Sequence, residues 1–364
     1  MMPLIRPAGP ADWPAVRQCM REVFAENPGQ KTGDFTDALW SWQYEQIPGG
    51  SLVLLAELDG TVAGYYHALF ETLTYEGVPV VAGMVQDVAT KAVHRKLGIF
   101  KQVGGVALEE MRQKGVEFIY TFPNHRSLPS FIRNHAYSVV TQVPVLLLPL
   151  KLGPLARGRV QDKAPALAGL AGLAGSVIQP FYRGWMTRTL HLQHGEQIER
   201  LTEATEEMER LAAHLTSQTA ISLRRDRQYL QWRFFDKPTQ EYEIWGLRKA
   251  GALEAFVVTR TAEILGSRCL MLMDFGYDRG QEQAVCRLAS ERIHAAEKSG
   301  HALSLAMGLH PVFSALRQLG FRRVPERFDP RVFSLVAKQV SNVPRPLLFE
   351  ERNWTISLAD WDVY

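Results

Sequence analysis

The strongest constraint on the fold of this chain is an internal repeat. An aromatic triplet, Trp42-Gln43-Tyr44, is followed by Pro48, and a similar triplet with its own proline recurs 190 residues later. Agreement in order, spacing and element type predicts that one fold is present twice. The matched features are Trp232-Arg233-Phe234 with Pro238, the turns Asp59-Gly60 and Ala250-Gly251, and the pairs Ser130-Phe131 with Ala136-Tyr137 and Phe313-Ser314 with Gly320-Phe321.

Length and composition agree with two folded domains. The 364 residues exceed one ordinary domain, and 46% hydrophobic with 22% charged residues exclude a disordered chain. The formal charge of +3 is too balanced to predict nucleic-acid binding. We expect a first domain over residues 1–150, a linker over 151–195, a second domain over 196–340 and a docking tail over 341–364.

The cysteines and histidines do not indicate a metal site. Cys19, Cys269 and Cys286 are far apart and lack the CxxC spacing of zinc sites and disulfide frameworks. His191 and His194 have no nearby carboxylate as a third ligand, so surface positions are expected. No bound metal is therefore expected. The N-terminus lacks the apolar core of a signal peptide, which predicts a cytoplasmic protein. The apolar stretch from about Ala164 to Ile178 is shorter than a membrane span requires.

Strand and helix signals alternate along the first half. Residues 78–89 and 116–120 read as strands, residues 97–114 read as a helix, and Asp59-Gly60 marks a hairpin. Alternation combined with hairpins predicts an α/β fold with a mixed sheet. The Ala-, Gly- and Leu-rich stretch 151–179 is expected to pack as an irregular or helical linker over the core, with an interfacial membrane contact as the alternative.

The segment 84–101 carries the clearest chemical signal. A strand ending near Thr90 runs through a short basic loop into a helix, which gathers backbone N–H groups and the positive helix end at one place. Arg95, Lys96 and Lys101 add positive charge, so an anion site for phosphate or pyrophosphate is predicted. The loop lacks the glycines of Walker A and Rossmann motifs, which disfavours a nucleotide triphosphatase and a dehydrogenase.

Over roughly residues 3–145 the chain resembles the GCN5-related N-acetyltransferase (GNAT) family. The hexapeptide from Arg95 to Phe100 fills the Q/R-x-x-G-x-G/A loop of that family except at Phe100, which replaces a small residue. The resemblance implies tandem GNAT-like domains that use acetyl-coenzyme A or another acyl-coenzyme A. It assigns coenzyme contacts to Val88, Ala89, Thr90, Arg95, Lys96, Leu97, Gly98, Ile99, Phe100, Lys101, Asn124 and Ser127.

The groups that would move protons are less clearly marked. Family members often carry a tyrosine in the last helix as general acid, whereas Phe131 and Ile132 stand near that position here. Asp87 and Glu71 lie on expected strands near the thioester, and a desolvated carboxylate can accept the amine proton. The alternative interpretation of both is a hydrogen-bonded acid in a strand.

The second repeat is predicted to have lost the coenzyme site. Its strand ends near Gly276, and the loop that follows carries Asp278 and Glu282 where a pyrophosphate requires positive charge. This half is therefore expected to be a degenerate copy that closes a cleft wall or covers a strand edge.

Three functions remain open. The first is acyl-coenzyme A-dependent N-acyl transfer, most simply acetylation, to a small-molecule amine such as an amino sugar. The second is long-chain N-acyl transfer from an acyl carrier protein, and the third is acyl-coenzyme A binding without turnover.

The tail 353–364 is expected to be ordered. Trp354, Ile356 and Leu358 alternate with period two, which predicts an extended segment with one buried face. We expect it to dock on a sheet and to bring Asp360, Asp362 and the carboxylate of Tyr364 towards the cleft between the domains. The alternative is that the tail only seals a sheet edge.

Overall fold

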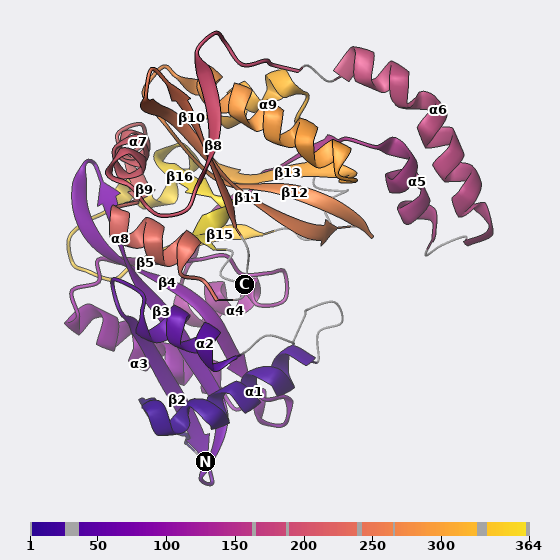
Figure 1. Cartoon of the computed structure of the whole chain (residues 1–364). Coiled ribbons are helices and arrows are strands. Elements are labelled where there is room, and N and C mark those ends of the chain that lie inside the picture. The colour runs from indigo at the N-terminus through magenta and orange to yellow at the C-terminus, as the bar shows by residue number, and fades with distance from the viewer. Residues whose placement is uncertain are drawn as a thin grey trace.

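The computed structural model describes residues 2–25, 36–161, 165–186, 189–238, 242–264, 266–325 and 333–361 (Figure 1). Two halves with the same order of elements are joined by a helical hairpin and closed by the C-terminal tail. The first half contains β1 (Leu4–Pro7), α1 (Trp13–Ala25), α2 (Asp37–Trp40), β2 (Ser51–Leu58), β3 (Thr61–Tyr75), β4 (Val78–Thr90), α3 (Ile99–Gln113), β5 (Phe118–Thr121), α4 (Leu128–His135), β6 (Ser138–Gln142) and β7 (Val145–Pro149).

The second half repeats this order with one added short strand. In both halves the strands corresponding to β2, β3 and β4 are antiparallel, and the strand after the long helix is parallel to its neighbour. The elements are β8 (Glu196–Leu201), α7 (Glu206–Thr216), β9 (Ile221–Leu223), α8 (Arg227–Leu230), β10 (Glu243–Lys249), β11 (Ala252–Ile264), β12 (Ser267–Tyr277), α9 (Glu282–Lys298), β13 (Leu303–Leu309), α10 (Phe313–Leu316), β14 (Arg322–Arg323) and β15 (Ser334–Gln339). The predicted mixed sheet and tandem fold are confirmed.

The two halves exchange their last strands. β15 of the second half lies between β5 and β6 of the first, and β7 of the first half lies between β13 and β14 of the second. Each exchanged strand satisfies the hydrogen-bonding edge of the other half. Strand pairing therefore crosses the expected boundaries 1–150 and 196–340, so that neither segment holds a complete sheet by itself.

The tail joins the halves into one sheet. β16 (Trp354–Ser357) is parallel to β9 and antiparallel to β13, and β9 in turn pairs with β3. Trp354 and Ile356 are buried as the alternation predicts, but Thr355 and Ser357 are buried as well. The tail is thus a central strand, which the edge-sealing interpretation did not predict. Asp362 and Tyr364 lie outside the described residues.

The two repeat tryptophans meet at the junction. Trp42 and Trp232 stack with ring centroids 4.7 Å apart and an interplanar angle of 11°. Each indole Nε1 donates to the other residue's backbone oxygen, at 2.7 and 2.8 Å. These reciprocal contacts place an approximate twofold axis between the repeats, and they explain why both halves carry the aromatic triplet.

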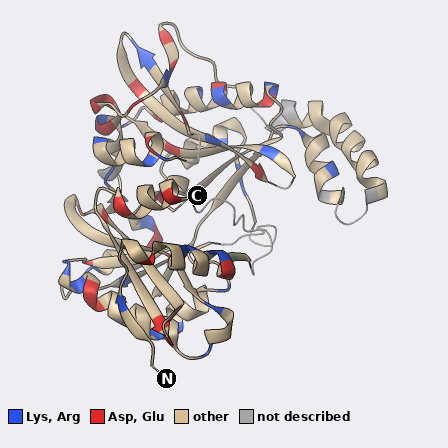
Figure 2. Cartoon of the chain, turned by 60° about the horizontal axis from the view of Figure 1, so that its bottom comes forward, with Lys and Arg blue, Asp and Glu red and all other residues tan. Residues whose placement is uncertain are grey.

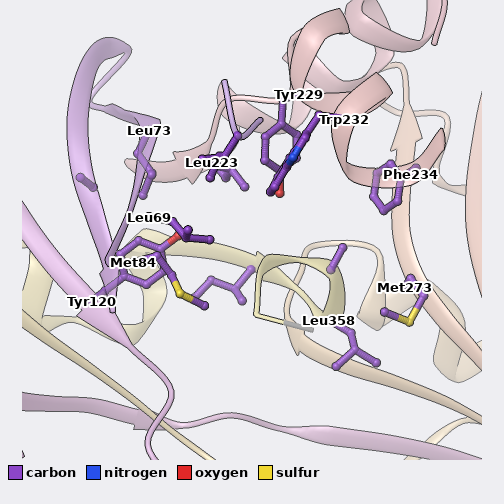
Figure 3. Close-up of a cluster of buried hydrophobic side chains, with 14 of the residues drawn as sticks. Leu69, Leu73, Met84, Tyr120, Leu223, Tyr229, Trp232, Phe234, Met273 and Leu358 are labelled. Carbon is purple, nitrogen blue, oxygen red and sulfur yellow. The ribbon is translucent and has the colours of Figure 1, made fainter. Parts of the chain in front are cut away.

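The core is continuous across the junction. Figure 3 shows side chains from both halves and from the tail converging in one buried cluster. Its labelled members are Leu69, Leu73, Met84, Tyr120, Leu223, Tyr229, Trp232, Phe234, Met273 and Leu358. We therefore expect the two repeats to unfold together rather than as separate units.

The linker forms two helices, α5 (Leu152–Gln161) and α6 (Ala168–Met186). They pack on each other and extend away from the rest of the chain (Figures 1 and 2). Its helical character agrees with the sequence, but the expectation that it covers the core is wrong. None of the helices among the described residues is both long enough and apolar enough to cross a lipid bilayer.

Candidate active site

A β-bulge in β4 determines where the candidate site lies. Gln86 pairs with His67 and Ala89 pairs with Tyr65, so β4 carries one more residue than β3 across this step. Asp87, within the bulge, has φ 49°, a left-handed conformation that few residues other than glycine, Asn and Asp adopt. Bulges of this kind redirect a side chain from the regular alternation of a strand.

The Asp87 carboxylate is held by a π-helical turn, Ser41–Glu45. The Tyr44 hydroxyl donates a short hydrogen bond to Asp87 Oδ2, and Gln43 Nε2 donates to the same oxygen at 3.1 Å. Asp87 itself is only half-buried. The sequence indicated Asp87 as a candidate but not these two partners, because the triplet Trp42-Gln43-Tyr44 indicated only the repeat.

Buried polar groups without a partner lie on the neighbouring strand positions. Within the described part of the chain, both ring nitrogens of His67, the side-chain amide of Gln86 and the Tyr65 hydroxyl have no hydrogen-bond partner. Desolvation lowers the pKa of His67 to about 3, so its ring is neutral. Unsatisfied buried polar atoms are rare in native proteins, and a group of them beside a carboxylate indicates a place where a ligand binds. Only the lone histidine in the apolar run 62–70 signalled these residues in the sequence.

β4 and β5 separate beside the bulge. They pair in parallel from Ala82 with Phe118 to Met84 with Tyr120, and β5 ends at Thr121 while β4 continues to Thr90. In the described residues no strand therefore pairs with the β5-facing edge of β4 at Val88, Ala89 and Thr90. An open strand edge offers backbone donors and acceptors to an extended amide-containing ligand.

The loop after β4 has the conformation of an anion site. Lys96 has φ 71° and Gly98 has φ 74°, and α3 begins immediately afterwards with Gly98 as its N-cap. Gly98 has no side chain to cap the helix, so the first N–H groups of α3 point into the loop. Arg95, Lys96 and Leu97 are exposed around it, and Arg95 Nε donates to the Thr90 oxygen at 3.3 Å.

Of the remaining residues predicted to contact the coenzyme, some pack in the interior and one lies on the surface. Ile99 is buried, whereas Lys101 is exposed. The Phe100 ring contacts the rings of Phe131 and His135 in α4, with centroids 5.3 and 4.7 Å away. Phe100 therefore packs between the two helices, which leaves room at the loop despite its size.

Asn124 and Ser127 have a local structural role. The side-chain oxygen of Asn124 accepts from the backbone N–H groups of Arg126 and Ser127 at 3.0 and 3.1 Å, which organises the turn before α4. The Ser127 hydroxyl donates to the Asn124 backbone oxygen at 3.3 Å. Asn124 is exposed and Ser127 is half-buried, so these contacts leave the turn accessible.

Glu71 lies away from the bulge, at the junction of the repeats. It pairs with Ala82, five residues before Asp87, and Tyr120 donates a short hydrogen bond to its carboxylate. Desolvation raises the pKa of Glu71 to about 7, and the nearby Asp360 carboxylate contributes in the same direction. The two acids that the sequence placed together are thus separated along the sheet.

Replacing Glu71 with Gln should change how stability depends on pH. Between about pH 4.5 and 7 the folded chain keeps the Glu71 proton and the unfolded chain releases it, so this group stabilises the fold below that window and the contribution is lost as pH rises through it. E71Q should therefore gain roughly 2–3 kcal/mol relative to the parent between pH 5 and pH 8. Urea unfolding of both chains at the two pH values measures this, and a constant difference would contradict it.

The counterpart site in the second repeat is filled by the chain itself. Asp274 pairs with Val258 next to the corresponding bulge of β12, and it is fully buried. Arg225 Nε donates to Asp274 at 2.6 Å, and Arg225 Nη2 donates to Asp360 of the tail at 2.6 Å. Arg233, which matches Gln43, donates to the Ala359 oxygen at 2.9 and 3.0 Å. Asp360 therefore binds Arg225 of the second repeat and also lies near Glu71 of the first, at the junction of the repeats.

The corresponding loop of the second repeat carries an acidic residue. Asp278, in the loop between β12 and α9, accepts from Arg210 at 2.6 Å and lies 3.1 Å from His214. Its carboxylate keeps negative charge where the first repeat has Arg95 and Lys96. The predicted degeneration of this half agrees with both observations.

Comparison with known proteins finds a domain-family match in the first repeat. Residues 4–140 match the model of the acetyltransferase (GNAT) domain. No curated protein matches the sequence significantly. Among solved structures, a GCN5-related N-acetyltransferase from Anabaena variabilis shares 10% identity, with 93% of this chain and 73% of that chain covered and a TM-score of 0.64.

Two further solved structures share the arrangement of both repeats. A tandem GNAT protein from the clavulanic acid biosynthesis pathway is 12% identical, covers 94% of this chain and 100% of its own, and has a TM-score of 0.56. N-myristoyltransferase from Saccharomyces cerevisiae, solved with myristoyl-CoA, is 10% identical, with coverages of 93% and 79% and a TM-score of 0.60. This chain has a tandem GNAT fold, and residues 4–140, in its first repeat, match the GNAT domain family.

Proposed function

We propose that the chain is an acyl-coenzyme A-dependent N-acyltransferase whose reaction takes place at the β4 bulge of the first repeat. The observation that carries the proposal is the position of Asp87, between the open edge of β4 and the unpartnered polar groups of His67 and Gln86. The open edge of β4 on one side of the Asp87 carboxylate would hold the thioester, and the polar groups of His67 and Gln86 on the other side would contact a polar acceptor.

The described residues fit coenzyme A. The open edge at Val88, Ala89 and Thr90 would hold the pantetheine amides, and the loop Arg95–Lys101 with the first N–H groups of α3 would hold the pyrophosphate. Asn124 and Ser127 would contact the coenzyme from the turn before α4. The packing of Phe100 against α4 removes the crowding that its size suggests.

The chemistry is a direct attack of an amine on the thioester carbonyl. Asp87 would accept the proton that the amine loses as the new C–N bond forms and the C–S bond breaks. Backbone N–H groups near Val88 and Ala89 would stabilise the negative charge that develops on the carbonyl oxygen. Phe131 and Ile132 cannot donate a proton to the leaving group. Coenzyme A can leave as the thiolate without one, because an ordinary thiol has a pKa of about 8.5.

The acceptor side favours a small polar amine. His67, Gln86 and Tyr65 offer hydrogen-bonding atoms, and the Trp40 and Trp13 rings, 4.9 Å apart, offer apolar surface next to them. Amino sugars combine these two characters, because hydroxyl groups and one apolar ring face occur in the same molecule. The acyl group is acetyl or a longer chain.

The decisive experiment supplies acyl-coenzyme A of several chain lengths together with a panel of amines and amino sugars. Thiol release and the mass of the acylated product are followed together. Product formation supports the proposal. Binding of coenzyme without product over the whole panel would support a non-catalytic protein, and acylation only from acyl carrier protein would support the carrier-dependent alternative.

Reversing the charge of the loop should weaken coenzyme binding. R95E/K96E removes two cations beside the expected pyrophosphate, so we expect the dissociation constant for coenzyme A to rise about 10- to 100-fold by calorimetry. R279E, in the corresponding loop of the second repeat, is the matched control, since Arg279 is equally exposed. Equal affinities in the parent and R95E/K96E would remove the site assignment.

A further inference from the structure

The α5–α6 hairpin has the surface of a lipid-binding element. Six apolar side chains of the hairpin are 54–79% exposed, and most of them lie along α6 at a helical spacing that forms one stripe. Phe181, at 79%, is the most exposed of the six. The six are Leu167, Leu170, Leu173, Val177, Ile178 and Phe181.

The two helices pack through their small residues. A Cβ atom on Gly153 would lie 2.3 Å from Ser176 Oγ, and one on Gly175 would lie 2.7 Å from the Leu152 oxygen. The helices therefore touch through glycine and serine while leucine and phenylalanine face outward. A helical hairpin in water normally buries the large apolar residues, whereas helices in lipid pack through small residues and direct the large ones outward.

The hairpin is fixed to the sheet by its other side. The Gln179 side chain accepts from the Leu152 N–H and donates to the Leu150 oxygen, both at 2.6 Å, next to the end of β7. These two bonds connect α6 to the end of β7, and the hairpin extends from the body of the molecule (Figures 1 and 2). The two hydrogen bonds of Gln179 thus anchor the helix that carries the apolar stripe.

The net positive charge of the hairpin segment favours an anionic partner. Residues 151–188 carry six basic residues against one acidic residue, Asp162, so this segment is strongly basic in an otherwise nearly neutral chain. Of these, Arg157 is exposed on α5. A basic segment that carries an apolar helical stripe matches the composition of an element that binds an anionic lipid surface, which attracts cations. The basic residues are Lys151, Arg157, Arg159, Lys163, Arg183 and Arg188.

We propose that the α5–α6 hairpin docks the enzyme on the surface of an anionic lipid bilayer. The apolar stripe of α6 enters the boundary between headgroups and acyl chains, and the net positive charge of residues 151–188, to which the exposed Arg157 contributes, attracts the anionic headgroups. This role is independent of the reaction at Asp87, and it gives a reason for an apolar helix that the catalytic fold does not use.

The test measures binding of the full chain to vesicles. Co-sedimentation with vesicles of phosphatidylcholine alone and of phosphatidylcholine with phosphatidylglycerol gives the partition coefficient. The parent should bind the anionic vesicles, and L173Q/V177Q/F181Q should lower the partition coefficient about tenfold or more. The control L4Q/V78Q/V343Q changes residues that are 53–61% exposed elsewhere, and it should bind like the parent.

The other outcomes overturn the proposal. These are equal binding to neutral and anionic vesicles, no binding to either, or equal loss in the control. Sedimentation of the chain in buffer distinguishes a second copy, because a dimer broken by L173Q/V177Q/F181Q would assign the stripe to self-association. Binding of acyl carrier protein that depends on the same three residues would assign it to that partner. Circular dichroism confirms that each variant is folded.

Discussion

Replacing Asp87 with Asn should lower kcat/KM for amine acylation by about 10²- to 10⁴-fold, the contribution typical of a general base. The amide cannot accept the proton, but it keeps the shape of the side chain and tolerates the left-handed backbone at φ 49°. Coenzyme affinity should stay near that of the parent, because the loop at Arg95 and Lys96 is untouched. Steady-state kinetics with calorimetry separate the two effects.

Asp59 provides the matched control for this change. It also has φ 49°, but it lies in the exposed turn between β2 and β3. D59N makes the same chemical change at the same backbone conformation, so its turnover should equal that of the parent. If D87N kept turnover within about threefold of D59N, Asp87 would not be the base.

Tyr44 is expected to act through Asp87. Its hydroxyl donates to the carboxylate, so it fixes the orientation of Asp87 rather than touching the acceptor in the proposed reaction. The sequence could not distinguish this role, since Tyr44 belongs to the same aromatic triplet as Trp42. Trp42 packs at the junction of the repeats and Tyr44 supports the candidate site, and both side chains are buried.

The repeat was predictable because both halves need the same core. Trp42 and Trp232 pack on each other, so neither can change alone, and the aromatic spacing survives in both copies. The loop was predictable as well, since charge and helix position follow directly from local sequence. The exchange of strands between the repeats could not be predicted, because the apolar pattern of β7 is the same whichever sheet the strand joins.

The tail illustrates the limit of periodicity. Alternation at Trp354, Ile356 and Leu358 predicted one buried face, and a strand with neighbours on both sides buries the intervening Thr355 and Ser357 too. Small polar residues can be buried when their hydrogen bonds are satisfied, as Ser357 is by Arg225 at 3.0 Å. Such a partner, 132 residues away, leaves no mark in local sequence.

Arg225 is the residue whose loss should cost the most stability. Its guanidinium is buried between the Asp274 and Asp360 carboxylates. Desolvation opposes the charge on Arg225, but the two carboxylates outweigh it and raise the pKa of the arginine. R225M leaves both acids buried without a cation, and we expect the free energy of unfolding to fall by about 3–5 kcal/mol.

Urea unfolding measures this loss, and Arg224 supplies the control. Arg224 is the adjacent residue, with an exposed side chain and a long contact of 3.9 Å to Asp226, so R224M should stay within about 0.5 kcal/mol of the parent. The variant D274N/R225M/D360N removes the acids together with the cation and should recover part of the loss. A loss below about 1 kcal/mol in R225M would contradict the buried-pair account.

Hydrogen exchange in R225M would show which part of the fold depends on this cation. Arg225 joins the end of β9, the bulge region of β12 and the tail, so its removal should speed exchange first in residues 354–361. β16 in turn links β9 to β13, which means that release of the tail opens the sheet between the repeats. Asp274, next to the β12 bulge, therefore stabilises the junction between the repeats, whereas Asp87, within the β4 bulge, is proposed to perform chemistry. The two carboxylates differ because Arg225 and the tail enclose Asp274, while Asp87 stays half-buried.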